Sequence, residues 1–102
     1  MRHHFAGRAR DTYGTIQQSV PVYVYYTDTT SAAPIYTTYS GGTVVNVAPQ
    51  VNTDTAGYFQ FYVDDTEIVP GTLFDILCEN ITYDKIDIFK NAWFSPKKYF
   101  IL

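Results

Sequence analysis

Short stretches of the chain alternate hydrophobic and polar residues, which is typical of β-strands with one buried face. The clearest is Tyr58–Val63, where every second residue from Phe59 onward is aromatic or aliphatic. A tight turn is expected before it, because the Asp54 carboxylate can accept the following backbone N–H groups and Gly57 can adopt the positive φ that often ends such a turn. The pattern therefore predicts a half-buried strand with a fixed register.

The same alternation predicts about seven short strands, with turn residues every eight to twelve positions. This spacing is typical of an antiparallel β-sandwich. We therefore predict an all-β fold, a single antiparallel β-sandwich over residues 1–90, with an extended C-terminal tail over residues 91–102. The expected strands are His3–Arg10, Val20–Thr27, Pro34–Tyr39, Thr43–Val47, Tyr58–Val63, Thr72–Glu79 and Asp84–Phe89.

Length and composition agree with this fold class. A chain of 102 residues fits one domain, and its many tyrosine, threonine, valine and phenylalanine residues favour sheet over helix. No run of some 18 apolar residues is present, and the first residues lead into no apolar signal segment, so neither a membrane span nor secretion is expected. The single cysteine, Cys78, is expected in the core.

Charge is distributed unevenly along the chain. The net charge is −3, which argues against general nucleic-acid binding. Nine of the ten acidic residues lie between Asp11 and Asp84, a range without lysine or arginine. Either the basic ends are simply solvated, or they contact the acidic surface of another copy or of a partner. The basic residues are Arg2, Arg8, Arg10, Lys85, Lys90, Lys97 and Lys98.

The last twelve residues combine an apolar character with a break at Ser95 and Pro96. An apolar terminus is expected to bury its side chains against a surface. It either folds back on its own sandwich or docks onto a neighbouring subunit by strand addition. The side chains that would make these contacts are Trp93, Phe94, Lys97, Lys98, Tyr99 and Phe100.

Residues that could carry catalysis are sparse. His3 and His4 are adjacent on an expected strand and so point to opposite faces, which disfavours both a Ser-His-Asp arrangement and a metal clamp. Asp64, Asp65 and Glu67 lack the spacing of a calcium loop. We predict that the protein is not an enzyme and has no cofactor or metal.

Tyrosine supplies the strongest surface signal. Tyr23, Tyr25, Tyr58 and Tyr62 lie on strand faces opposite the aliphatic ones. Tyrosine at such positions gives rigid contact area with a polar tip, as binding surfaces use. The alternative is that these rings only cover their cross-strand neighbours.

Several segments together resemble a known family of small sandwiches. Segments 7–16 (GRARDTYGTI) and 20–25 (VPVYVY) resemble the opening G-x-V-x-D-x-x-G hairpin and second strand of Ig-like sandwiches of the prealbumin-like or carboxypeptidase-regulatory-like type. Segments 33–36 (APIY), 41–42 (GG), 50–63 (QVNTDTAGYFQFYV) and 70–76 (PGTLFDI) are more specifically similar to the sandwich module of tailed-bacteriophage structural proteins. Ala9 departs from the pattern, which has a larger apolar residue there.

The resemblance spans Gly7 to Phe89 and implies assembly rather than catalysis. It implies a virion protein, assembled in the host cytoplasm, that occurs in several copies on capsid, neck or tail and cements subunits or anchors tail fibres. A carbohydrate-binding or adhesion module is the alternative, with a host glycan as partner. The expected contact residues are Arg2, Arg8, Arg10, the four tyrosines named above and the six tail residues.

Overall fold

The computed structural model describes residues 1–11, 13–78 and 81–90. Within them the chain forms strands and no α-helix, which confirms the all-β prediction. No helix in this part of the chain has the length and apolar character needed to cross a membrane. The strands are β1 (Arg2–Arg8), β2 (Pro21–Tyr26), β3 (Val51–Asn52), β4 (Tyr58–Asp64), β5 (Phe74–Cys78) and β6 (Ile81–Ile86).

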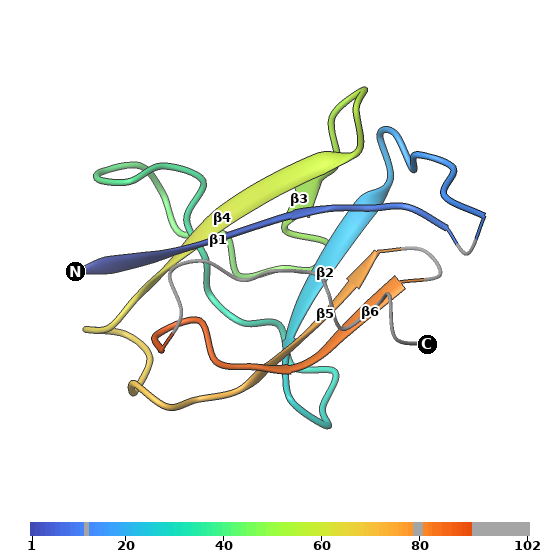
Figure 1. The fold of residues 1–102 in the computed structure, drawn as a ribbon. Helices are drawn as coiled ribbons and strands as arrows, with labels where there is room; N and C mark the ends of the chain where they lie inside the picture. Colours follow the sequence, from blue (N-terminus) through green and yellow to red (C-terminus); the bar gives the residue numbers. More distant parts are fainter. Residues whose placement is uncertain (12, 79–80, 91–102) are drawn as a thin grey trace.

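The strands form two antiparallel sheets (Figure 1). One contains β1 and β4, and the other has the order β3-β2-β5-β6. Alternate residues of both sheets are buried in one shared core, as expected when one face of each strand is apolar. Phe5 on β1 lies at its centre, with its ring centroid 5.4 Å from that of Phe61 and 5.5 Å from that of Tyr83. This arrangement is consistent with a β-sandwich.

The turn before β4 forms as predicted. One carboxylate oxygen of Asp54 accepts the backbone N–H groups of Ala56 and Tyr58 at 2.8 and 2.9 Å. Gly57 has φ of 83°, and a Cβ there would lie 2.7 Å from Ile16 and 2.9 Å from a backbone oxygen. Glycine is therefore required both for its conformation and for the close approach of the neighbouring loop.

Two of the predicted strands are absent, and this is a correction. Pro34–Tyr39 and Thr43–Val47 make only isolated bridges, between Ile35 and Val45 and between Tyr36 and Tyr62. The physical reason is that this part of the chain passes from one sheet to the other: Ala32 pairs with β2 and Tyr36 pairs with β4. A segment that crosses between layers cannot continue a ladder with either one.

The side chain of Gln50 holds this crossing in place. It is 7% exposed, and its amide accepts a hydrogen bond from the backbone N–H of Val24 at 2.9 Å. Its nitrogen donates to the carbonyls of Val24 and Ala33 at 2.8 and 2.9 Å. Buried polar groups need hydrogen-bond partners. The Gln50 amide therefore forms hydrogen bonds with backbone groups that would otherwise pair with a longer β3.

The last strand begins earlier than predicted. Asp84–Phe89 was expected, whereas β6 covers Ile81–Ile86. A register shift next to Asp75 gives Lys85 a φ of 52°, and the Asp75 carboxylate accepts the Lys85 N–H at 3.1 Å. A bulge of this kind changes the alternation, so that Tyr83 and Ile86 both face the core at 1% exposed.

Candidate functional site

The outward side of the β1–β4 sheet brings several predicted contact residues together. Because Phe5 and Phe61 face the core, the even-numbered residues of both strands face outward. The register pairs Arg2 with Asp64, His4 with Tyr62, Ala6 with Gln60 and Arg8 with Tyr58. We call this surface the β1–β4 outer face. It comprises Arg2, His4, Ala6, Arg8, Tyr36, Tyr39, Tyr58, Gln60 and Tyr62.

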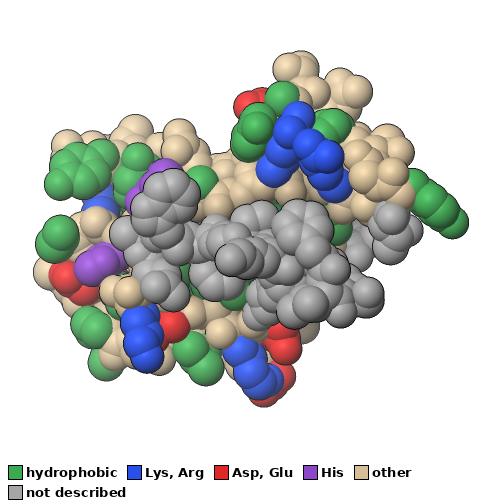
Figure 2. All heavy atoms as spheres, viewed as in Figure 1, with side chains coloured by type: hydrophobic (Ala, Val, Ile, Leu, Met, Phe, Trp, Pro, Cys, Tyr) green, Lys and Arg blue, Asp and Glu red, His purple; other side chains and the backbone are tan. Residues whose placement is uncertain are grey.

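Arg8 lies over the ring of Tyr58 at one end of this face. Its guanidinium carbon is 4.6 Å from the ring centroid, and its Nε donates to the carbonyl of Ala56 at 2.8 Å. Among the described residues its two terminal nitrogens have no hydrogen-bond acceptor. Tyr58 is 51% exposed. Figure 2 shows a group of Lys and Arg side chains over this part of β1. The pair therefore presents a positively charged, planar surface that can bind an anionic group.

A stack of rings occupies the middle of the outer face. His4 lies 4.8 Å from Tyr62 with the ring planes 29° apart, and its Nε2 is 2.8 Å from the side-chain oxygen of Gln60. Tyr39, from the crossing segment, meets Tyr62 edge-on at 6.1 Å and is 67% exposed. These contacts fix the rings in place, so a partner would meet a preorganised surface.

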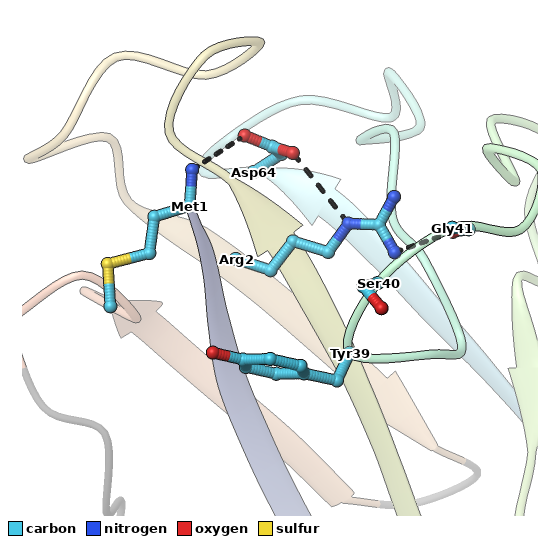
Figure 3. Close-up of a pocket in the computed structure, with 6 residues that line it drawn as sticks. All are labelled: Met1, Arg2, Tyr39, Ser40, Gly41 and Asp64. Atoms are coloured by element: carbon cyan, nitrogen blue, oxygen red, sulfur yellow. Dashed lines mark hydrogen bonds and ion pairs between the residues drawn. The ribbon is translucent and has the colours of Figure 1, made fainter.

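Arg2 is used inside the molecule. Its guanidinium carbon lies 3.6 Å from the ring centroid of Tyr36, and Nη1 donates to the carbonyls of Thr38 and Gly41 at 2.9 and 2.7 Å. Its Nε is 3.7 Å from Asp64. Figure 3 shows the contacts of Arg2 with Gly41 and Asp64. Although Arg2 was predicted to meet a partner, its donors hold the crossing segment against the sheet.

A shallow hollow of about 360 Å³ adjoins Arg2. Figure 3 shows the six residues around it. Its lining residues are Met1, Arg2, Tyr39, Ser40, Gly41 and Asp64. The hydrogen-bonding groups of Arg2 and Asp64 are already bound to each other and to their neighbours, so the hollow has few free groups with which to orient a small ligand.

Carboxylates at this end of the sheet are held in their ionised form. The backbone N–H and the hydroxyl of Thr66 both donate to Asp64, and they lower the pKa of Asp64 to about 2. His3 donates to Asp65 across 3.0 Å, which lowers the pKa of Asp65. The Tyr36 hydroxyl donates to Glu67 at 2.6 Å, and this raises the pKa of Tyr36. These groups have structural partners, which leaves them poorly suited to proton transfer.

The four predicted tyrosines lie on two different outer faces. Tyr58 and Tyr62 lie on the β1–β4 outer face, whereas Tyr23 and Tyr25 point outward from the four-stranded sheet. Since the inner faces of both sheets share one core, the two pairs lie on opposite sides of the molecule. Tyr23 and Tyr25 stack on each other, with centroids 6.0 Å apart and planes 26° apart.

The remaining predicted contact residues lie elsewhere. Arg10 is exposed and follows β1, where it forms a bridge with Ile16. The predicted tail contacts, from Trp93 to Phe100, fall outside the described residues. Tyr39 and His4 belong to the outer face but were missed, since their neighbours come from the crossing segment and from β4. Only the alternation in β1 indicated that His4 faces outward.

The two histidines point to opposite faces, as predicted from their adjacency. His3 contacts Asp65 and meets Phe89 edge-on at 4.9 Å, while His4 contacts Gln60 and Tyr62 on the outer face. Within residues 1–11, 13–78 and 81–90, no three His, Cys, Asp or Glu side chains gather as a metal site would require. Both histidines are thus bound to neighbouring side chains of the described part of the chain.

Comparison with protein-family models, with curated proteins and with solved structures finds no match for this chain.

Proposed function

We propose that the protein is a non-enzymatic structural component that joins a larger assembly through its β1–β4 outer face. The observation that carries this proposal is the pairing of Arg8 with Tyr58. A guanidinium with free terminal donors lies over a half-exposed ring, next to the fixed stack of His4 on Tyr62. Aromatic and arginine side chains of this kind dominate the energetics of protein interfaces.

The assembly that we propose is the virion of a tailed bacteriophage. In it the chain, as an Ig-like or prealbumin-like sandwich module, occurs in several copies on capsid, neck or tail and cements subunits or anchors fibres. Support comes from the resemblance of segments 7–16 and 50–63 and from the matching geometry of their two turns. Asp11 caps its turn by accepting the N–H groups of Tyr13 and Thr15, just as Asp54 does before β4.

The test follows the chain into particles. The chain is expressed with the capsid, neck and tail proteins of the genome that encodes it, and purified particles are probed for it. We expect the chain in the particles at several copies each. Arg8→Glu should reduce this amount at least about tenfold, because a reversed charge at an interface costs 1.4 kcal/mol or more. Tyr23→Ala, on the opposite side of the molecule, is the matched control. Particles that lack the unaltered chain would contradict the proposal.

A second candidate, a carbohydrate-binding module, has one observation in its favour. The stacked pair Tyr23 and Tyr25 forms a partly exposed aromatic platform beside Leu77, and flat aromatic surfaces suit the apolar faces of sugar rings. Saturable binding of a glycan to the purified chain, lost in Tyr23→Ala and retained in Arg8→Glu, would favour this role over assembly.

A further inference from the structure

β1 is an edge strand, and its backbone pairing shows which groups are open. The Asp65 N–H donates to the carbonyl of Met1, and the Ala9 N–H donates to that of Gly57. In an antiparallel ladder hydrogen-bonded pairs alternate, so the odd-numbered residues of β1 bond to β4. The backbone groups of the even-numbered residues point away from β4. No described residue hydrogen-bonds to the backbone of His4 or Ala6. Figure 1 shows β4 as the strand beside β1.

The charges of the side chains beside this edge determine which kind of strand could be added to it. The Arg8 guanidinium lies over Tyr58 of β4, and its terminal nitrogens have no acceptor among the described residues; Arg10 lies exposed just beyond the strand. A second copy of β1, paired antiparallel along its whole length, would place Arg2 opposite Arg8 twice, and like charges in that position are destabilising. An extended segment with carboxylates on its outward side has the complementary charge.

We infer that the free edge of β1 accepts, by strand addition, an extended segment of another protein that has acidic residues at alternate positions. The added strand continues the β1–β4 sheet, bonds to the backbone of His4 and Ala6, and places a carboxylate beside Arg8. This inference rests on the proposed docking role, because it names the segment that docks. The particle assay tests that role by itself, so a chain that enters particles but never binds such a strand overturns only the edge inference.

Three variants separate strand addition from other binding. Ala6→Pro removes an N–H that points to the free edge and bonds to no described residue, so the β1–β4 ladder keeps its hydrogen bonds. Ala6→Thr changes the same outward position but keeps the N–H. Arg8→Glu keeps the backbone edge and reverses the charge, and it provides a second test should Ala6→Pro fail to fold.

The experiment measures amide hydrogen exchange by NMR in the full chain, with a capped peptide of alternating glutamate and valine and with its lysine–valine counterpart. We expect the acidic peptide to slow exchange at His4 and Ala6 by about tenfold or more, because paired amides exchange only on opening. The lysine peptide should have no effect, Ala6→Pro should abolish the protection at His4, and Arg8→Glu should reverse the preference. Slow exchange of both amides in the protein alone, or equal effects of both peptides, would overturn the inference.

Discussion

At the scale of single residues, the core depends on one position without a side chain. Gly7 lies on the inward side of β1, and a Cβ there would meet the Phe59 ring at 2.7 Å and the Tyr83 hydroxyl at 2.8 Å. Both neighbours are buried, at 4% and 1% exposed, so neither has room to move. Glycine thus lets the two aromatic side chains close over the strand.

Gly7→Ala should therefore destabilise the protein by about 1–3 kcal/mol, the usual cost of adding a carbon to a packed core. Chemical denaturation of the full chain measures the free energy of unfolding. Ala6→Ser, one position away on the exposed side of the same strand, should change it by less than about 0.5 kcal/mol. Equal effects of the two substitutions would mean that the close approach at Gly7 is not tight.

The pKa of Asp64 gives a prediction for acid. It is about 2 in the folded chain, below the ordinary value of 3.8, because the Thr66 N–H and hydroxyl donate to the carboxylate. The ionised form is thus favoured on folding, and its stabilisation is complete above pH 4 and lost as the pH falls toward 2. Thr66→Val removes the hydroxyl and should raise the pKa of Asp64, as measured by carboxyl carbon NMR. Thr82→Val, at an exposed strand position, is the control and should leave that pKa where it is.

At the scale of elements, the connection between the sheets depends on a side chain in place of a ladder. The segment from Ala32 to Tyr36 leaves β2 and reaches β4 through two isolated bridges. Gln50 satisfies the backbone of Val24 and Ala33 beside it. The alternation of residues in this segment therefore predicted strands where the chain only passes between layers.

Gln50→Leu keeps the approximate volume but leaves two buried backbone groups, the Val24 N–H and the Ala33 carbonyl, without this partner, while the Val24 carbonyl keeps the Ala33 N–H. Each unsatisfied group costs about 1–3 kcal/mol, so we expect a loss of at least about 2 kcal/mol in the free energy of unfolding. Gln18→Leu, at an exposed loop position, should be close to neutral. A neutral Gln50→Leu would show that other groups or water replace the amide.

Hydrogen exchange provides a second readout of the same substitution. The amide of Val24 donates to Gln50, so it should exchange faster in Gln50→Leu, while the amide of Tyr62, which donates to Tyr36, keeps its partner. Faster exchange at both sites would instead mean that the whole fold has been destabilised.

At the scale of the whole molecule, the two outer faces differ in chemistry. The β1–β4 face combines arginine, histidine and tyrosine, whereas the four-stranded sheet presents stacked tyrosines beside Leu77 and Asp75. The two faces therefore differ in the kind of chemical group that each could bind. Substitutions on the two faces should have independent effects, because distant sites without shared neighbours act additively.

Light scattering tests whether residues 91–102 join copies of the chain. If they form an assembly arm, the full chain should be an oligomer in solution and the chain ending at residue 90 a monomer. Arg8→Glu in the full chain reports separately on the β1–β4 outer face. A monomer in both lengths would contradict self-assembly through residues 91–102 and leave the outer face as the leading contact.

Alternation along the chain determined the fold class, the four main strands and their inward sides. It did so because burial of one strand face requires apolar residues at every second position, a local property. Asp54 and Gly57 also predicted the turn before β4, and the adjacency of His3 and His4 predicted their opposite directions. Only the tertiary structure decided which strands share a sheet. That choice placed Tyr23 and Tyr25 on a different face from Tyr58 and Tyr62. It bound Arg2 to the crossing segment and left the terminal nitrogens of Arg8 without an acceptor among the described residues. The sequence does not show this because pairing between distant segments depends on the packing of the whole core.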